Sequence, residues 1–377
     1  MKRYDDNDIK ELISVIESGK LGTAKCKGNK TVEFEVLFAK KIHSKYAVAV
    51  SSATGGLHMA LLASGIGQGD EVIVDPLFKF GAITAIHTNA KPVFTDVEQD
   101  TFMVSVRMLE KCVTKRTKAV IVTNIFGCTP NLHAIKRFCQ ERGIILIEDC
   151  AQSIMAVCGE SKAGTIGNLG VFSFQSTKHL TTGDGGIVVT DDEVLYNNLL
   201  ALREHGYVRN NYVDTYNSTK SLGWMYRITE LQSAVGVAQL RKLDAIVDYH
   251  IAIGERLTKA LQTEKINPQK AKYGKHVYWK WVAFCSDPNL FDYLKDNFDN
   301  EPLISFGHNR EKVVYQSSSF QQGQYIKGIE TCVIAEELVK AMIIIKIGIE
   351  YNIEQYEELM GRLKNAIDRF YNKLSES

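Results

Sequence analysis

Short apolar runs alternate with segments of helical spacing through the first two thirds of the chain. Runs of this length, bounded by polar residues, are typical of buried strands, whereas apolar residues three and four positions apart indicate helices. The alternation is clearest from Pro92 to Asp149 and predicts right-handed βαβ units, hence an α/β fold with a mainly parallel central sheet flanked by helices. We expect strands at residues 46–51, 71–74, 93–94, 119–122, 144–147, 171–174 and 187–189, and helices near 105–112, 132–141 and 193–204.

Helical spacing also marks both ends of this region. Ile9, Leu12, Ile13 and Ile16 share one face of a predicted helix over Asp8–Gly19, and a long amphipathic helix is expected from Thr229 to about Leu261. Beyond it we expect helices near 288–297, 335–342 and 353–371 and a strand over 277–285. The pattern predicts two domains, a large one over residues 1–250 that includes an N-terminal entry segment, and a smaller C-terminal α+β domain over 251–377.

Composition excludes several classes of protein. The 377 residues are 45% hydrophobic and 24% charged, as expected of a soluble globular protein, and 45 basic against 44 acidic residues give no field that would attract nucleic acid. The longest apolar candidate, Ala341–Ile349, is broken by Lys346 and is far shorter than the ~18 residues of a membrane span. The start of the chain lacks the apolar core of a secretory signal, so we expect a cytoplasmic protein. The eight cysteines form no CxxC pair, so neither a metal site nor a disulfide framework is expected.

One lysine, Lys178, lies in the polar stretch between the last two predicted strands of the sheet. A lysine amine becomes a nucleophile only where burial or a neighbouring charge lowers its pKa, and a glycine-rich loop between strands can provide such a place. Ser173, five residues earlier, can donate its hydroxyl to an anion, and Gly183 and Gly185 would allow a flat ligand to approach the backbone. The alternative interpretation is a solvated lysine in a hairpin loop.

A turn of small residues, SSATGG, follows the first predicted strand and opens a helix that stops near Gly65. Backbone N–H groups and the positive end of a helix dipole face an anion placed at such a turn. Thr54 and Gly55 are therefore candidate phosphate-binding residues, although an ordinary strand–turn–helix connection has the same pattern.

The run SFQSTKHLTTGDGG around Lys178 closely resembles the lysine segment of the DegT/DnrJ/EryC1/StrS sugar aminotransferases. These are pyridoxal phosphate (PLP) enzymes with the aspartate aminotransferase-like fold, fold type I. The resemblance implies that Lys178 forms the Schiff base with PLP. A dehydratase branch of the family carries histidine at this position, but here the histidine, His179, comes one residue later.

Three further segments match the family in order. SSATGGLHMAL resembles the segment that binds the cofactor phosphate and places Thr54 and Gly55 there. The last aromatic of PLFKF, Phe80, matches the residue that stacks on the cofactor ring, with a core phenylalanine as the alternative. EDCAQS resembles the motif whose carboxylate, Asp149, hydrogen-bonds the pyridine nitrogen and whose Gln152 lies near the phenolic oxygen; a structural acid is the alternative for Asp149.

The remaining candidates concern substrate and partner. By resemblance Thr23, His205 and Arg227 are possible substrate contacts, together with Arg203 and Tyr207. Exposed loop residues are the simpler interpretation of Arg203, His205 and Tyr207, a plain linker is the alternative for Thr23, and loop bracing is the alternative for Arg227. GWMYRITE resembles a family segment whose asparagine reaches the cofactor phosphate of the partner subunit in a homodimer. This chain has Met225 at that position.

Together these features predict a PLP-dependent transaminase of deoxyamino sugar and polysaccharide biosynthesis. It would move an amino group from an amino acid, glutamate by resemblance, to a nucleotide-linked keto-deoxysugar, with sites shared between the subunits of a homodimer. Ile304–Phe320 lacks the prolines expected of the family, so the identity of the substrate stays open. The alternatives are a cyclitol or aminoglycoside-type ketone as acceptor, and a catalytically idle regulatory homologue.

Overall fold

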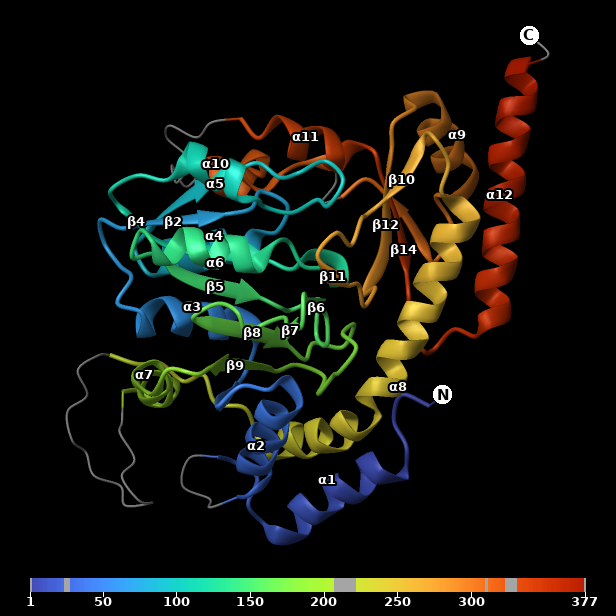
Figure 1. Cartoon of the computed structure of the whole chain (residues 1–377). Helices are drawn as coiled ribbons and strands as arrows, with labels where there is room; N and C mark the ends of the chain where they lie inside the picture. Colours follow the sequence, from blue (N-terminus) through green and yellow to red (C-terminus); the bar gives the residue numbers. More distant parts are fainter. Residues whose placement is uncertain (1, 24–27, 207–221, 309–310, 323–330, 376–377) are drawn as a thin grey trace.

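A seven-stranded sheet forms the centre of the molecule in the computed structural model, which describes residues 2–23, 28–206, 222–308, 311–322 and 331–375 (Figure 1). The strand order is β1-β9-β8-β5-β4-β2-β3. Within this sheet β9 runs antiparallel to both neighbours and the other pairs are parallel, so the predicted mainly parallel sheet is confirmed. The strands are β1 (Tyr46–Val50), β2 (Glu71–Val74), β3 (Lys91–Phe94), β4 (Thr117–Thr123), β5 (Ile145–Asp149), β8 (Leu169–Ser173) and β9 (Gly186–Thr190).

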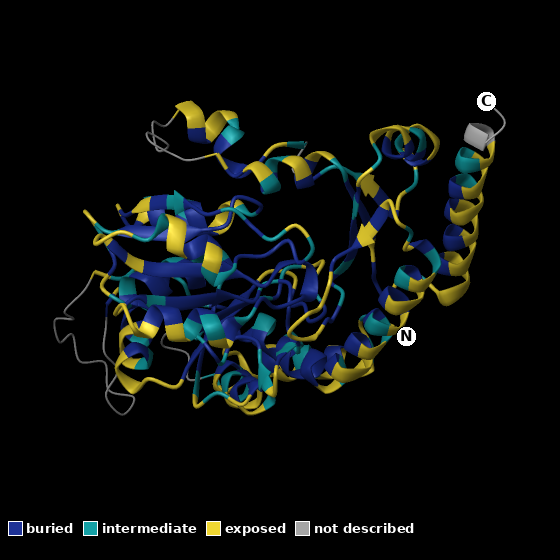
Figure 2. Cartoon of the chain, turned by 45° about the horizontal axis from the view of Figure 1, so that its top comes forward, coloured by how far each residue is buried: buried dark blue, intermediate teal, exposed yellow. Residues whose placement is uncertain are grey.

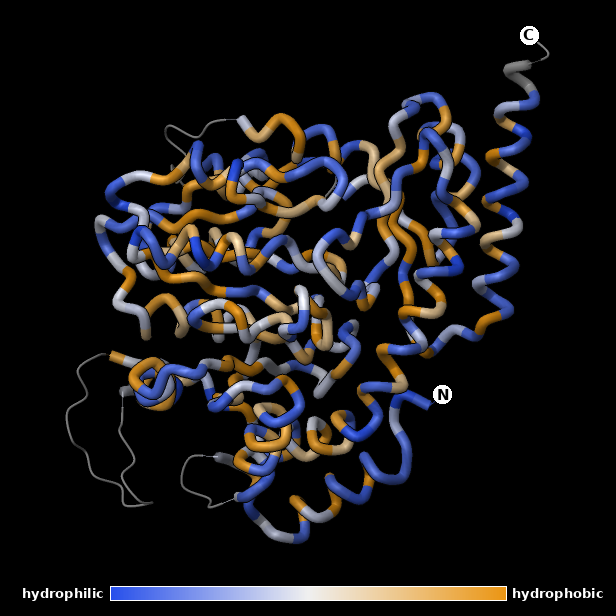
Figure 3. Tube along the Cα trace, in the orientation of Figure 1, coloured by the Kyte–Doolittle hydropathy of each residue, from blue (hydrophilic) through white to orange (hydrophobic). Residues whose placement is uncertain are grey.

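Helices cover both faces of this sheet because its strands are apolar on both sides. In β1, Val48 and Val50 belong to one buried cluster and Ala47 and Ala49 to another. Most residues of these strands are accordingly hydrophobic and buried, with Lys91 and Lys118 as exposed exceptions (Figures 2 and 3). At the β1 edge, α3 (Ala53–Ala63) and α7 (Glu193–Arg203) pack on one face and α2 (Lys30–Ile42) on the other. Three further helices of the first 150 residues are α4 (Lys79–His87), α5 (Val106–Cys112) and α6 (Leu132–Gln140).

The long helix α8 (Glu230–Leu261) connects the seven-stranded sheet to a second, four-stranded sheet (Figure 1). It begins at a capping box, in which Thr229 and Gln232 satisfy each other's backbone N–H groups. Its 32 residues span ~48 Å at 1.5 Å per residue. The first half packs against α1 (Asp6–Ser18) and α2, and the second half joins a separate buried cluster.

That second cluster lies on a four-stranded sheet of order β10-β12-β14-β13. Trp281 and Tyr356 are its largest fully buried side chains. The predicted boundary at residue 250 falls inside α8 and stays a prediction. The elements are β10 (Ile266–Pro268), β12 (Lys280–Cys285), α9 (Pro288–Phe298), β13 (Ile304–Phe306), α10 (Ser318–Gln322), α11 (Val333–Lys340), β14 (Met342–Lys346) and α12 (Ile353–Ser375).

Several predicted elements differ in their bounds, among them one strand and one helix of the C-terminal part. The strand expected from Val277 begins at Lys280, because Tyr278 adopts a left-handed φ of 47° and its N–H donates to His276 Nδ1. Gly127 makes this turn possible, since a Cβ there would lie 2.7 Å from the Tyr278 nitrogen. The helix expected to reach Met342 ends at Lys340, and Met342 starts β14. A small sheet of β6 (Val157–Cys158), β7 (Ser161–Lys162) and β11 (Gly274–Lys275) was not predicted.

No helix in the described ranges is both long and apolar enough to cross a lipid bilayer. The seven cysteines that the structure describes are free thiols, and Cys26 lies outside the described residues.

Candidate active site

The neighbouring parallel strands β5 and β8 bring Asp149 to the loop that carries Lys178. Asp149 is the last residue of β5 and pairs with Val171 of β8, whose chain then continues into the lysine loop. The Asp149 side chain is 3% exposed, and burial raises its pKa to about 6, against the opposing effects of the Ala151 N–H and the Lys178 charge. Above pH 6 this carboxyl is therefore an anion that the protein solvates poorly.

Lys178 lies against the indole ring of Trp279, which comes about a hundred residues later in the sequence. Its Nζ is 3.6 Å from the centroid of Trp279, whose own Nε1 donates a 2.8 Å hydrogen bond to the Thr177 carbonyl and so fixes the ring beside the loop. Burial lowers the pKa of Lys178 to about 7; the Asp149 charge opposes this shift and the Lys280 charge adds to it. Near neutral pH a large fraction of the amine is thus unprotonated and able to act as a nucleophile.

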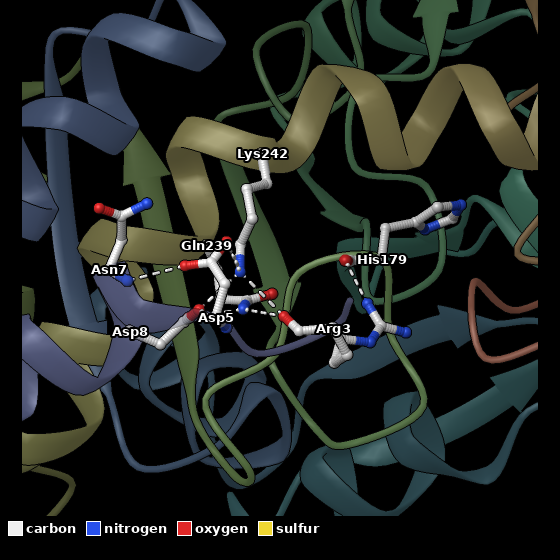
Figure 4. Close-up of polar contacts among 7 residues, drawn as sticks. All are labelled: Arg3, Asp5, Asn7, Asp8, His179, Gln239 and Lys242. Atoms are coloured by element: carbon white, nitrogen blue, oxygen red, sulfur yellow. Dashed lines mark hydrogen bonds and ion pairs between the residues drawn. The ribbon is translucent and has the colours of Figure 1, made fainter. Parts of the chain in front are cut away.

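The lysine loop is also held from the N-terminal segment (Figure 4). Arg3 Nη1 donates to the carbonyl oxygen of His179, 2.9 Å away. The carbonyl of Arg3 in turn accepts from Gln239 Nε2 (2.8 Å) and Lys242 Nζ (2.9 Å), and the Asp8 carboxylate accepts from the same two side chains. Arg3 therefore connects α8 to the residue that follows Lys178.

The His179 ring points away from this chemistry. Its Nε2 donates to the Val277 carbonyl at 2.9 Å, and its ring lies 4.3 Å from that of His250, which donates to the Tyr278 carbonyl. Burial lowers the pKa of His179 well below its usual range and that of His250 to about 4. Both rings are neutral at physiological pH and connect the lysine loop to the segment that leads into β12.

We expect Arg3→Met to loosen the lysine loop. A hydrogen bond to a charged group contributes about 1.5 kcal/mol or more, so backbone amides of residues 176–182 should exchange hydrogen roughly tenfold faster in the variant. Hydrogen exchange followed by mass spectrometry measures this directly. Arg241→Met is the matched control, because Arg241 pairs with Glu11 on the same side of α8 at an exposed position. Equal protection of 176–182 in Arg3→Met and wild type would contradict the anchoring role.

The two candidate phosphate-binding elements lie side by side. Ser173 of β8 pairs with Gly186 of β9, and Gly186 also pairs with Val50 at the end of β1. A Cβ at Gly186 would lie 2.6 Å from the Ala53 nitrogen, so only glycine allows α3 to begin this close to β8 and β9. The Ser173 hydroxyl and the N-terminus of α3 thus face the same region.

The start of α3 borders an open pocket of roughly 650 Å³. The N-cap residue Ser52 accepts from the Gly55 N–H at 3.1 Å, so this one of the predicted phosphate donors has a partner within the helix cap. Tyr226 packs against Gly55 and its hydroxyl lies 2.5 Å from His58 Nδ1. The pocket is lined by Ser52, Thr54, Gly55, His58, Leu62, Ile83, Thr84, His87, Leu222, Gly223, Trp224 and Tyr226.

Gln152 and Phe80 occupy contrasting environments. Gln152 is buried, and its Oε1 accepts from the Phe126 N–H at 2.8 Å, which leaves its amide NH₂ group as the available donor. Phe80 lies in the first turn of α4 with 37% of its surface exposed, so the alternative of a core phenylalanine does not hold.

The predicted substrate residues come from three segments that meet near the start of α8. Isolated bridges join Gly22 to Thr229, Glu204 to Met225, and Val50 to Arg227. Thr23 Oγ1 donates to the Ile228 carbonyl (3.2 Å), and His205 is exposed, with its backbone N–H donating to the Trp224 carbonyl.

The arginines in these segments are engaged in ion pairs. Arg227 Nη1 lies 3.3 Å from Glu204 Oε1, in agreement with a loop-bracing role. Arg203 pairs with Glu35 at 2.5 Å and also donates to the Ala49 carbonyl, so its contacts are structural. Tyr207 lies outside the described residues.

Residues of the site that the sequence analysis missed include Trp279, Lys280 and Asp75. Asp75 follows β2 and is buried; it accepts from the Leu77 and Phe78 N–H groups and contacts the Thr123 hydroxyl. Its charge adds to the raised pKa of Asp149. The available signal for Lys280 was a lysine between two tryptophans at the start of an apolar strand. Within the described ranges, no group of three His, Cys, Asp or Glu residues is arranged to hold a metal ion.

The chain is similar to known proteins both in sequence and in fold. The sequence model of the DegT/DnrJ/EryC1/StrS aminotransferase family matches residues 2–364. The chain is 37% identical over 315 residues to the spore coat polysaccharide biosynthesis protein SpsC of Bacillus subtilis, covering 79% of this chain and 80% of that protein. It is 35% identical over 280 residues to the GDP-perosamine synthase of Vibrio cholerae, covering 73% and 74%. An aminotransferase structure from Psychrobacter cryohalolentis superposes with a TM-score of 0.88 over 98% of both chains at 24% identity, which shows a shared fold.

Proposed function

The chain belongs to the DegT/DnrJ/EryC1/StrS aminotransferase family, and on that premise we propose that it transfers an amino group from an amino acid to a nucleotide-linked keto-deoxysugar. The observation that carries this proposal is the pairing of Lys178, an amine with a pKa near 7, with the buried carboxyl of Asp149 at the ends of β8 and β5. Glutamate is our proposed donor, by the resemblance of the sequence.

The residues present fit the family's cofactor, pyridoxal 5'-phosphate. Lys178 would hold its carbonyl carbon, Asp149 its pyridine nitrogen and the Gln152 amide its phenolic oxygen. Its phosphate would lie between the Ser173 hydroxyl and the α3 turn at Thr54 and Gly55, which Gly186 holds together, and Phe80 offers the exposed aromatic face. When bound, PLP supplies an electron sink and carries the amino group between donor and acceptor.

The protein's own groups then have separate tasks. Asp149, a carboxylate above pH 6, would keep a proton on the pyridine nitrogen of the bound cofactor. Lys178 Nζ can take the proton from Cα of the amino donor and return it, because its pKa near 7 lets it act as a base and as an acid near neutral pH. The indole of Trp279 covers the amine and excludes water from it.

The nature of the acceptor is supported by the relatives. One is named a GDP-perosamine synthase, and perosamine is an amino sugar linked here to a nucleotide. Another is named a protein of spore coat polysaccharide biosynthesis, which supports a role in polysaccharide biosynthesis. The particular keto sugar and its nucleotide stay open, and a cytoplasmic location stays a prediction from the sequence.

An absorption spectrum of the protein loaded with PLP tests this function. We expect a visible band from the cofactor held by Lys178, which glutamate should shift. A screen of nucleotide-linked keto sugars and inososes as acceptors then separates a sugar from a cyclitol substrate. Absence of the band, or a band that no amino donor shifts, would favour the idle homologue.

We also propose that the enzyme is a homodimer with sites built from both subunits. A run of exposed apolar side chains supports this, because Leu222, Trp224 and Met225 are 95%, 72% and 56% exposed next to the pocket at α3. Large apolar side chains grouped on a surface are typical of an interface.

In this dimer Met225 takes the place of the family's asparagine, so we expect Met225→Asn to retain the cofactor better. A thioether cannot donate a hydrogen bond to phosphate, whereas an amide can, and one hydrogen bond to a charged group is worth on the order of 1.5 kcal/mol, about tenfold in affinity. Both proteins would be dialysed after glutamate treatment, when the covalent link to Lys178 is broken, and the retained cofactor measured. Equal or poorer retention by the variant would mean that residue 225 does not face the partner's phosphate site.

A further inference from the structure

A second lysine, Lys280, shares the indole that covers Lys178. Lys280 is the first residue of β12, and its Nζ lies 4.5 Å from the Trp279 centroid, compared with 3.6 Å for the Nζ of Lys178. The distance between the two Nζ atoms is therefore no greater than the sum of these two distances. Two amines from residues a hundred positions apart in the sequence thus converge on one ring of the candidate active site.

Among the described residues, no negatively charged side chain pairs with Lys280. Throughout the described ranges, no Asp or Glu lies within salt-bridge distance of its Nζ, although sixteen other ion pairs of the molecule meet that limit. Its charged neighbours are positive: Lys178 across the indole, and Lys346, which is directly opposite in β14. The nearby ring of His308 is neutral, because burial lowers its pKa to about 4 and its Nε2 bonds the Leu77 carbonyl.

This arrangement costs stability unless a ligand compensates it. Lys280 is half-buried, burial lowers the pKa of its amine, and like charges opposite each other destabilise a strand pair. The five residues that follow it in β12 are apolar. An apolar side chain at this position would avoid the penalty, so the lysine indicates an anion that arrives from outside.

We propose that Lys280 binds an anionic oxygen group of a substrate beside Lys178, and this proposal rests on the proposed function. Two sources supply such a group. The amino donor has a carboxylate one bond from its reacting carbon, and the nucleotide-linked sugar has phosphates. An ammonium group forms strong charge-assisted hydrogen bonds with either, and the bound anion would neutralise the positive pair of lysines.

The test compares Lys280→Met with Lys346→Met, its matched control. Lys346 is opposite in register, but it is exposed and donates to the Pro302 carbonyl. The PLP-loaded proteins would be titrated with glutamate, followed by the shift of the visible band, and with inorganic pyrophosphate, followed by calorimetry. We expect Lys280→Met to weaken one of these ligands at least tenfold, as loss of a charged hydrogen bond predicts. Weaker binding of glutamate would show that Lys280 binds the carboxylate of the amino donor. Weaker binding of pyrophosphate would show that it binds a phosphate of the nucleotide-linked sugar.

Lys280→Arg and Lys280→Gln complete the design. Arginine keeps the charge and should retain most of the affinity, whereas glutamine should behave as methionine does, which also covers the case in which Lys280→Met does not fold. In the protein without cofactor, removal of the positive neighbour should raise the pKa of Lys178, measured by the pH dependence of its labelling. Wild-type affinity for both ligands in the charge-free variants, or an unchanged pKa of Lys178, would overturn the proposal. A wild-type protein without a glutamate-sensitive band would instead overturn the proposed function.

Discussion

Lys178→Ala is expected to lose the covalently held cofactor and at least ~10³-fold in turnover, since proton transfer by a positioned base alone contributes about 10²–10⁴. No other residue between Phe174 and Gly186 carries a primary amine. The adjacent His179 cannot substitute, because its ring is neutral, buried and bound to the Val277 carbonyl. The measurement is the visible band of the PLP-loaded protein together with multiple-turnover transamination.

Lys280 provides the control for this experiment. It is the other amine on the Trp279 ring, so residual attachment of cofactor in Lys178→Ala would have to come from this side chain. The double variant Lys178→Ala with Lys280→Met would remove it. An unchanged visible band and wild-type turnover in the double variant would refute the assignment of Lys178.

Asp149→Asn is expected to lower turnover by at least ~10²-fold, in the range of a lost electrostatic contact to a charge in the reaction. Asparagine keeps the shape and can still accept from the Ala151 N–H, which lies 3.0 Å from Oδ1, but it has no negative charge to hold a proton on the pyridine nitrogen. Turnover of the folded variant within about twofold of wild type, a change of only ~0.4 kcal/mol in the barrier, would refute this role.

The same variant should not lose stability at neutral pH. The folded-state pKa of Asp149, about 6, lies above its ordinary value, so the folded protein binds this proton more tightly than the unfolded chain. This carboxyl therefore reduces the free energy of unfolding as pH rises from about 4 to 6, and the reduction persists above pH 6. Asparagine removes that penalty. Urea unfolding of both proteins at pH 5 and pH 8 checks the sign of this effect. The free energy of unfolding of the variant, relative to that of wild type, should be higher at pH 8 than at pH 5.

Asp75→Asn is a useful contrast because it also removes a buried carboxylate at the end of a strand. The Asp75 carboxylate accepts hydrogen bonds from the Leu77 and Phe78 N–H groups and from the Thr123 hydroxyl, and these contacts are structural. Its replacement should affect stability more than turnover, the reverse of the pattern expected for Asp149.

The local pattern of the sequence determined most secondary-structure elements and the site residues Asp149 and Lys178. Periodicity reports whether a position is buried, so β2 was predicted with its observed bounds and most helices to within two residues. Asp149 and Lys178 were predicted as site residues from their own segments, and the parallel pairing of β5 with β8 brings them to the same edge of the sheet. The mainly parallel sheet and the family followed from the same segments.

Only the tertiary structure decided what surrounds Lys178. Trp279 precedes β12 and Lys280 begins it, about a hundred residues later in the chain, and Arg3 contacts the same loop from the N-terminal segment. Their contacts depend on how α8 carries the second sheet back onto the first and on the turn at Gly127 and Tyr278. A periodic pattern contains no information about which distant residue will face a given side chain. The pKa of Lys178 is set by burial and by the charges of Asp149 and Lys280, and so it is a property of the packed molecule alone.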